Sequence, residues 1–289
     1  WIGYENNNSP HNTWVQGHRG ATEIPLQRLP GFETDSLTDL LIEFIRDKAE
    51  QREGSGAPFF AVLSVQPPHD PYGAPAEFMG NYNPANLQLR PNVARVPWIE
   101  ETARRELAGA YAMVENLDWN LGRVREALRE TGLDTDTEII FFSDHGDLHG
   151  SHGQFRKTSP YAESLNIPII FGGGLDVQGG KIRRRTQIPV GLVDLAPTTL
   201  GLCGVPVPDW MQGTDYSCIK RRGVSEPDDF PDSAFAQIVV PTMHGNSVDK
   251  AWRCVVTRDG WKYACFEETE WLLFNLNEDP YEMANLAHN

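Results

Sequence analysis

The chain has 289 residues, of which 40% are apolar and 22% charged, and its formal net charge is −15. This ordinary composition excludes disordered and fibrous proteins and predicts a soluble globular protein. The acidic balance argues against a nucleic-acid partner, since phosphate binding needs clustered Lys and Arg. The one basic run, Lys181 with Arg183 to Arg185, is short, and we interpret it as a solvated loop. No apolar run reaches the ~20 residues that cross a bilayer, and the first residues carry no signal-like pattern, so no membrane span and no compartment is indicated.

The first third of the chain predicts a helix followed by a strand. From Thr34 onward, apolar residues recur on one helical face over TDSLTDLLIEFIRDKAEQ. The continuous apolar run Phe59 to Val65 stops at Pro67-Pro68, which is typical of a buried strand. His69 follows directly in the loop after this predicted strand.

The middle of the chain predicts a second helix and two further strands. Apolar residues spaced by three and four between Leu107 and Leu128 predict a long helix that Gly132 ends. Short apolar runs at 138–142 and 167–171 predict strands, and a helix is expected near Asp194. Helices that alternate with fully apolar strands favour an α/β fold with a mainly parallel sheet between helices. Val62, Ile140 and Ile169 are therefore expected on neighbouring parallel strands, with ligands beyond their carboxyl ends.

The character of the sequence changes after about residue 222. Alternating aromatic residues there predict a small antiparallel subdomain, so we predict two domains, 1–222 and 223–289. The segment 252–266 is predicted to be a hairpin around a two-residue Asp259-Gly260 turn, which would place Cys254 opposite Cys265. We expect both to remain thiols, because the predicted hydrogen-bonded pair is too wide for a disulfide.

The segment FFSDHGDLHGSHGQFRK, residues 141–157, carries most of the candidate chemistry. Asp144 and His145 offer adjacent oxygen and nitrogen ligands at a predicted strand end, as a divalent metal requires. An alternative is a three-histidine metal site of His145, His149 and His152, whose spacing would align them on a helix, but the intervening glycines disfavour that helix. Ser143, Asp144 and His145 are consecutive and cannot converge as a hydrolase triad, and no G-x-S-x-G occurs.

Five blocks in chain order resemble the type I sulfatases of the alkaline phosphatase superfamily: PFFAVLSVQPPHDPY, AYAMVENLDWNLGRVREAL, IIFFSDHGDLHGSHG, K-x-x-PYAESLNIPIIF and LFNLNEDPYEMANLA. The resemblance implies an alkaline phosphatase-like α/β fold. It further implies that Asp144 and His145 are metal ligands, where many relatives have Asn at the second position. By the same resemblance Lys157 contacts the sulfate group, and His69 contacts the sulfate and assists the leaving oxygen.

The departures from that family pattern concern its N-terminal part. The C-x-P-S-R motif whose Cys becomes formylglycine, two further metal aspartates and a G-K-W-H segment do not occur in this sequence. Cys254 begins a run that superficially mimics the cysteine motif, but the run lacks its Pro or Ala. We therefore expect the chain to be the C-terminal portion of a sulfatase, inactive without a missing N-terminal segment.

The resemblance implies a small-molecule or carbohydrate sulfate ester as substrate. Two alternatives stay open: a phosphodiesterase or phosphonate monoester hydrolase of the same superfamily, and a non-catalytic sulfatase-like binding protein. Ca²⁺ is the expected metal because carboxylate ligands are hard, and Mn²⁺ is the alternative because His145 adds a nitrogen.

Overall fold

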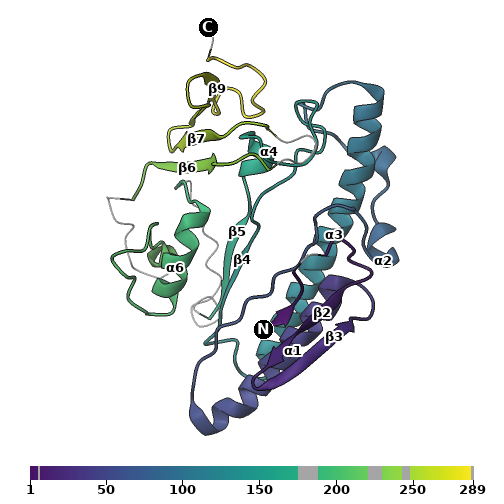
Figure 1. The fold of residues 1–289 in the computed structure, drawn as a ribbon, viewed down its shortest axis with the longest axis vertical. Coiled ribbons are helices and arrows are strands. Elements are labelled where there is room, and N and C mark those ends of the chain that lie inside the picture. The colour runs from purple at the N-terminus through teal and green to yellow at the C-terminus, as the bar shows by residue number, and fades with distance from the viewer. Residues whose placement is uncertain (6, 175–187, 221–229, 243–247, 288–289) are drawn as a thin grey trace. The chain divides into compact units, whose positions relative to one another are not determined.

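The computed structural model describes residues 1–5, 7–174, 188–220, 230–242 and 248–287 (Figure 1). The chain divides into two compact units. The first comprises residues 1–89 and 101–137, and the second comprises residues 90–100 and 138–289. The basic run and the predicted domain boundary after residue 222 lie outside the described residues, so the division into 1–222 and 223–289 stays a prediction.

The first unit combines a three-stranded antiparallel sheet with helices. Its core includes Phe32, Leu37 and Ile45 at the start and along the inner face of the first helix, which confirms the predicted helix. The second long helix is also confirmed, and Gly132 follows it with a φ of 68°. The elements of the first unit are β1 (Ile2–Gly3), β2 (Trp14–Arg19), β3 (Thr22–Arg28), α1 (Glu33–Ser55), α2 (Ala76–Met79), η1 (Pro84–Asn86) and α3 (Pro97–Glu130). The first residues of α3 belong to the second unit.

The predicted strand at 59–65 is wrong for this structure. The segment has no regular secondary structure, and Phe60 and Val62 are 73% and 72% exposed. An apolar run establishes only that a segment suits burial, whereas a strand also requires a partner for its backbone N–H and C=O groups. No strand in the described part of the chain pairs with this run.

Two strands in the second unit match their predicted places but not their predicted direction. β4 (Glu138–Phe142) and β5 (Ile169–Gly173) are antiparallel, with Phe142 opposite Ile169. A parallel pair needs a crossover that carries the chain back along the sheet. Here the backbone N–H of Gly146 bonds the carbonyl oxygen of Ser164 at 2.8 Å, which closes the connection at one edge, and its only helix, α4 (Ala162–Leu165), is a single turn.

A helical segment follows β5 in the second unit. The predicted helix near Asp194 is α6 (Leu195–Leu202), with Pro197 buried in its first turn, where proline is tolerated. η2 (Leu192–Asp194) precedes it and η3 (Ser217–Lys220) follows it. Among the described residues, no helix is long and apolar enough to cross a membrane.

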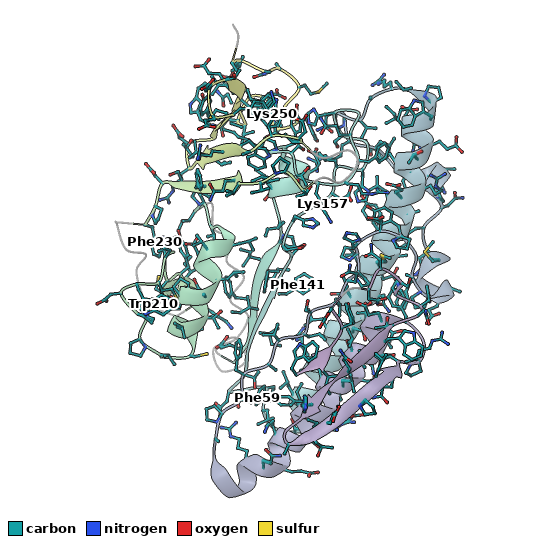
Figure 2. All side chains as sticks on the ribbon, in the orientation of Figure 1. Phe59, Phe141, Lys157, Trp210, Phe230 and Lys250 are labelled. Atoms are coloured by element: carbon teal, nitrogen blue, oxygen red, sulfur yellow. The ribbon has the colours of Figure 1, made fainter. Side chains whose placement is uncertain are left out.

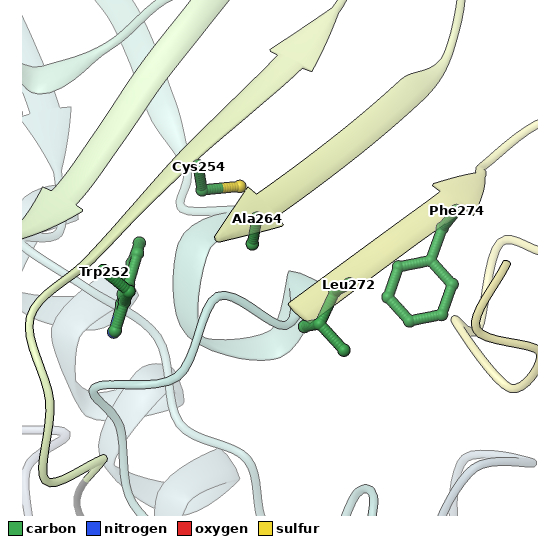
Figure 3. Packing of buried hydrophobic residues seen from close by; sticks show 5 residues of the cluster. All are labelled: Trp252, Cys254, Ala264, Leu272 and Phe274. Atoms are coloured by element: carbon green, nitrogen blue, oxygen red, sulfur yellow. The ribbon is translucent and has the colours of Figure 1, made fainter. Parts of the chain in front are cut away.

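The C-terminal part of the second unit is a four-stranded antiparallel sheet, as predicted. Its order is β6-β7-β8-β9. Its apolar face buries Trp252, Cys254, Ala264, Leu272 and Phe274 in one cluster (Figure 3). The strands are β6 (Ser233–Ile238), β7 (Trp252–Thr257), β8 (Trp261–Cys265) and β9 (Glu270–Asn275).

The register of the β7–β8 hairpin differs by one residue from the prediction. Cys254 lies opposite Ala264, and Cys265 lies opposite Arg253. The turn between Thr257 and Trp261 has three residues rather than two and places Gly260 at a φ of 93°, as three-residue hairpin loops prefer. One extra turn residue shifts the register by one, so each side chain of β8 lies on the face opposite to the predicted one. Both cysteines are free thiols, as predicted, and burial raises the pKa of the Cys254 thiol to about 11.

Candidate functional site

Asp144 and His145 lie at the end of β4 with two ligand atoms side by side. Nδ1 of His145 lies 2.9 Å from the carbonyl oxygen of Gly146, to which it donates, so in the neutral ring Nε2 is the nitrogen that can bind a metal. Nε2 lies 3.4 Å from Oδ2 of Asp144, and the Asp144 side chain is 79% exposed. In metal sites, a histidine that binds the metal through one ring nitrogen usually donates the N–H of the other to a carbonyl or carboxylate. The pair therefore fits part of a divalent metal shell.

The loop that follows is held by hydrogen bonds between its own residues. Oδ1 of Asp147 accepts the N–H groups of His149 and Arg156, each at 3.1 Å, and the Leu148 N–H bonds the Arg156 carbonyl at 2.7 Å. His149 and His152 both have positive φ, so no helix forms here. The helical alignment that a three-histidine site of His145, His149 and His152 would require does not occur, as the glycines indicated.

Lys157 lies in the same connection between β4 and β5 as Asp144 and His145 (Figure 2). It is half-buried and stands between Arg156 and Thr158, whose φ values are 75° and 80°. The hydroxyl oxygen of Thr158 accepts the Val248 N–H at 3.1 Å, and the Thr158 carbonyl accepts Nε1–H of Trp252 at 2.8 Å. The connection between β4 and β5 thus carries three of the four predicted site residues.

His69 belongs to the first unit. Its Nδ1 lies 2.7 Å from the carbonyl oxygen of Asp70 and 3.3 Å from the Asp70 carboxylate. Its backbone N–H bonds the Gln66 carbonyl at 3.0 Å, and the Gln66 N–H in turn donates to Oε1 of the fully buried Glu33 at 2.7 Å. The roles that the resemblance implies for His69, Asp144, His145 and Lys157 stay predictions.

Comparison with known proteins identifies the family. The Sulfatase family profile matches residues 3–205, and the profile of the C-terminal part of N-sulphoglucosamine sulphohydrolase matches residues 150–289. The chain belongs to the sulfatase family. An ulvan-active sulfatase of Formosa agariphila is 30% identical to this sulfatase-family chain over 250 residues, which cover 85% of this chain and 47% of the relative. Arylsulfatase K of Danio rerio is 34% identical over 192 residues, which cover 65% and 35%. The chain thus spans about half the length of these curated relatives, or less.

The solved structures agree on the fold. The yidJ protein of Bacteroides fragilis superposes with a TM-score of 0.80 and 25% identity, over 100% of this chain and 61% of that one. The resemblance to sulfatases and the alkaline phosphatase-like fold are confirmed. The strand directions described above are the local correction to that prediction.

A second polar cluster of this sulfatase chain lies in the second unit and was not predicted. One nitrogen or oxygen each of His152, Glu163 and Glu282 lie within 4.8 Å of one another. Nδ2 of Asn92 reaches Oε1 of Glu163 at 2.8 Å and Nε2 of His152 at 3.1 Å. The His152 ring stacks on Tyr161 with a centroid distance of 3.8 Å, and burial lowers the His152 pKa. Glu163 and Glu282 lie in two of the five sequence blocks described above. The cluster was not predicted because no sequence periodicity relates residues so far apart in the chain.

The donor types of this cluster suit a metal, but its charges are already balanced. Lys262 forms an ion pair with Glu282, and the two side chains are 2% and 0% exposed. Nε of Arg90 lies 2.9 Å from Oε1 of Glu163. Oε2 of Glu163 has no hydrogen-bond partner among the described residues. Because each carboxylate faces a cation, we interpret the cluster as a link within the unit.

Proposed function

We propose that the protein is a metal-dependent hydrolase that cleaves sulfate esters of small molecules or carbohydrates. The sulfatase profile over residues 3–205 is the observation that carries this proposal. It is supported by the connection between β4 and β5, a single segment that carries Asp144, His145 and Lys157. The phosphonate hydrolase alternative is less favoured, because the two curated relatives described above are named as sulfatases.

In this proposal Lys157 binds the sulfate group. The chain carries a net charge of −15, so an anionic ester needs a local cation to overcome the surrounding field. A lysine ammonium provides that charge and stabilises the sulfate oxygens as negative charge redistributes.

His69 is proposed to donate a proton to the departing ester oxygen. Because Nδ1 is directed at the Asp70 carbonyl oxygen, Nε2 is the ring atom that would transfer the proton. General acid catalysis of this kind requires the donor within hydrogen-bond reach of the leaving oxygen.

Asp144 and His145 are proposed to hold the metal together with ligands from outside this chain. Bound Ca²⁺, or Mn²⁺, would supply positive charge that polarises the sulfate group and the nucleophile. The proposed nucleophile is a formylglycine from a C-x-P-S-R segment that is also outside this chain. In this proposal Cys254 does not serve in that role, since it is buried in β7.

A substrate comparison tests the proposal. In the protein as its organism makes it, an aryl sulfate should be turned over at least ~100-fold faster than the matched phosphonate monoester or phosphodiester, and Lys157→Ala should reduce that rate by ~100-fold or more. Preferred hydrolysis of the phosphorus ester would contradict the proposal. Binding of inorganic sulfate without any turnover would favour the binding-protein alternative.

A further inference from the structure

We propose that the C-terminal sheet positions Lys157, with Glu282 and Trp252 as the positioning residues that hold the segment 156–162. The sulfate-binding role of Lys157 rests on the proposed function. The positioning itself rests on contacts inside the second unit.

The backbone on both sides of Lys157 has an unfavourable conformation. Arg156 and Thr158, on either side of Lys157, have φ values of 75° and 80°. A β-branched residue such as Thr rarely adopts this left-handed region. Such conformations persist only where surrounding contacts determine them, and they gather at functional sites.

The preceding loop holds Arg156, and residues in and beside the C-terminal sheet hold the segment beyond Lys157. The Val248 N–H and Nε1–H of Trp252 both bond Thr158, at 3.1 and 2.8 Å. Oε2 of Glu282 accepts the backbone N–H of Ala162, the first residue of α4, at 2.8 Å. The segment is therefore fixed next to Lys157 and again at the start of α4.

Glu282 is itself held in place. It is a non-glycine residue with a φ of 57°, and its other carboxylate oxygen pairs with Lys262 on β8. β8 pairs with β7, the strand that carries Trp252. The ion pair is almost fully buried, so neither charge can turn to water when its partner is lost. Glu282 thus links the first residue of α4 to β8 of the C-terminal sheet.

Fixing this segment would matter for catalysis because charge stabilisation depends on placement. A displacement of ~1 Å in a group that contacts the reacting atoms can cost a factor of ~100 in rate. In this proposal the C-terminal sheet affects the reaction rate by fixing the position of Lys157.

Two double variants separate the bond to Ala162 from the ion pair. Lys262→Gln with Glu282→Gln removes both charges but keeps an oxygen that can accept the Ala162 N–H, whereas Lys262→Met with Glu282→Met removes that acceptor as well. Amide hydrogen exchange is measured by mass spectrometry on the protein as its organism makes it. We expect exchange over 157–162 to be at least ~10-fold faster in the Met pair than in the Gln pair. Equal exchange in the two variants would overturn the proposal.

A matched tryptophan pair tests the second contact. Trp252→Phe removes the indole N–H that bonds Thr158, while Trp271→Phe makes the same change on β9, where the ring stacks on Phe266. Only Trp252→Phe should accelerate exchange at 157–162. The same acceleration in both variants would mean that the sheet is merely destabilised, which would overturn the assignment of Trp252.

A double-mutant cycle with Lys157→Ala provides the functional readout. If the sheet acts through Lys157, the Met pair should weaken competitive inhibition by inorganic sulfate about 10-fold in the parent protein and less than 2-fold in the Lys157→Ala background. Additive losses would overturn positioning of Lys157. If the parent protein cleaves no sulfate ester, the proposed function fails, while the exchange comparison still decides the positioning.

Discussion

Two buried glutamates, one in each unit, hold the segments that carry candidate catalytic residues, but they do so with different partners. Glu33 accepts the Gln66 N–H near His69, and Glu282 accepts the Ala162 N–H near Lys157. Glu33 is otherwise surrounded by neutral donors: the Tyr4 hydroxyl at 2.7 Å, Asn7 at 2.8 Å and Thr13 at 3.3 Å.

Glu282 instead has an ion pair with Lys262. A carboxylate among neutral donors can lose its charge without leaving an opposite charge behind, whereas the ion pair cannot lose one member alone. The comparison therefore predicts that the second unit is more sensitive to single charge changes than the first.

Lys262→Met should have the largest effect. It leaves the Glu282 carboxylate buried without its cation, which should lower the free energy of unfolding by about 3–5 kcal/mol. Chemical denaturation followed by tryptophan fluorescence measures this. A loss below about 1 kcal/mol would show that the pair is not the main support of Glu282, and would break the comparison.

Glu33→Gln should cost less. The amide keeps one acceptor, and the Tyr4 hydroxyl can turn to accept from the new NH₂ group, so about 1–3 kcal/mol is expected. Glu282→Gln in the other unit is the matched substitution and should cost more, because it strands the Lys262 ammonium. Equal losses would remove the distinction between the two anchors.

A metal titration sharpens the assignment of the polar groups. Asp144→Asn should weaken binding of Ca²⁺ or Mn²⁺ by about 10-fold or more, because it removes a charged ligand from the proposed shell. Glu163→Gln should leave the affinity unchanged within a factor of about 2, since its carboxylate already faces Arg90. Isothermal titration calorimetry on both variants measures this, and the reverse order would place the metal at His152, Glu163 and Glu282.

The smallest effect concerns pH. Burial lowers the pKa of His152 below its usual 6.5. The positive charge of Lys262 also lowers this pKa, while the carboxylates of Glu163, Glu282 and Asp279 raise it by a smaller amount. The unfolded chain therefore takes up this proton first, so the contribution of His152 to stability is full above pH 6.5 and declines as the pH falls below it. His152→Gln should remove this part of the pH dependence. Unfolding curves at pH 7.5 and 5.5 give the change in the free energy of unfolding for each protein. The prediction is wrong if this change is the same in the parent protein and in the variant.

Local patterns predicted the two long helices, α6 and the strands β4, β5, β7 and β8, but not how the strands pair. The apolar run at 138–142 coincides with β4, and the spacing of leucines anticipated α3. The direction of β5 relative to β4 depends on the Gly146–Ser164 bond, which no periodicity reveals. The hairpin was predicted with the wrong register because a three-residue turn and a two-residue turn share the same Asp-Gly signal.

The site was predictable where its residues are neighbours in sequence. Asp144 and His145 are adjacent, so a strand end suffices to bring their ligand atoms together. Lys262 and Glu282 form a buried pair only because β8 and the C-terminal tail meet in three dimensions. A lysine on a strand has no local feature that distinguishes a buried ion pair from a solvated charge.

Gly146 joins these observations at a single backbone position. Its carbonyl orients the His145 ring, its N–H closes the β4–β5 connection, and a Cβ at this position would lie 2.0 Å from the Glu163 carbonyl oxygen. A saturation library at this codon should therefore retain only glycine under selection for folded protein, because every other side chain would push Glu163 away from Asn92 and Arg90. The absence of a side chain at Gly146 thus sets how closely the candidate metal pair and the segment that follows Lys157 can approach.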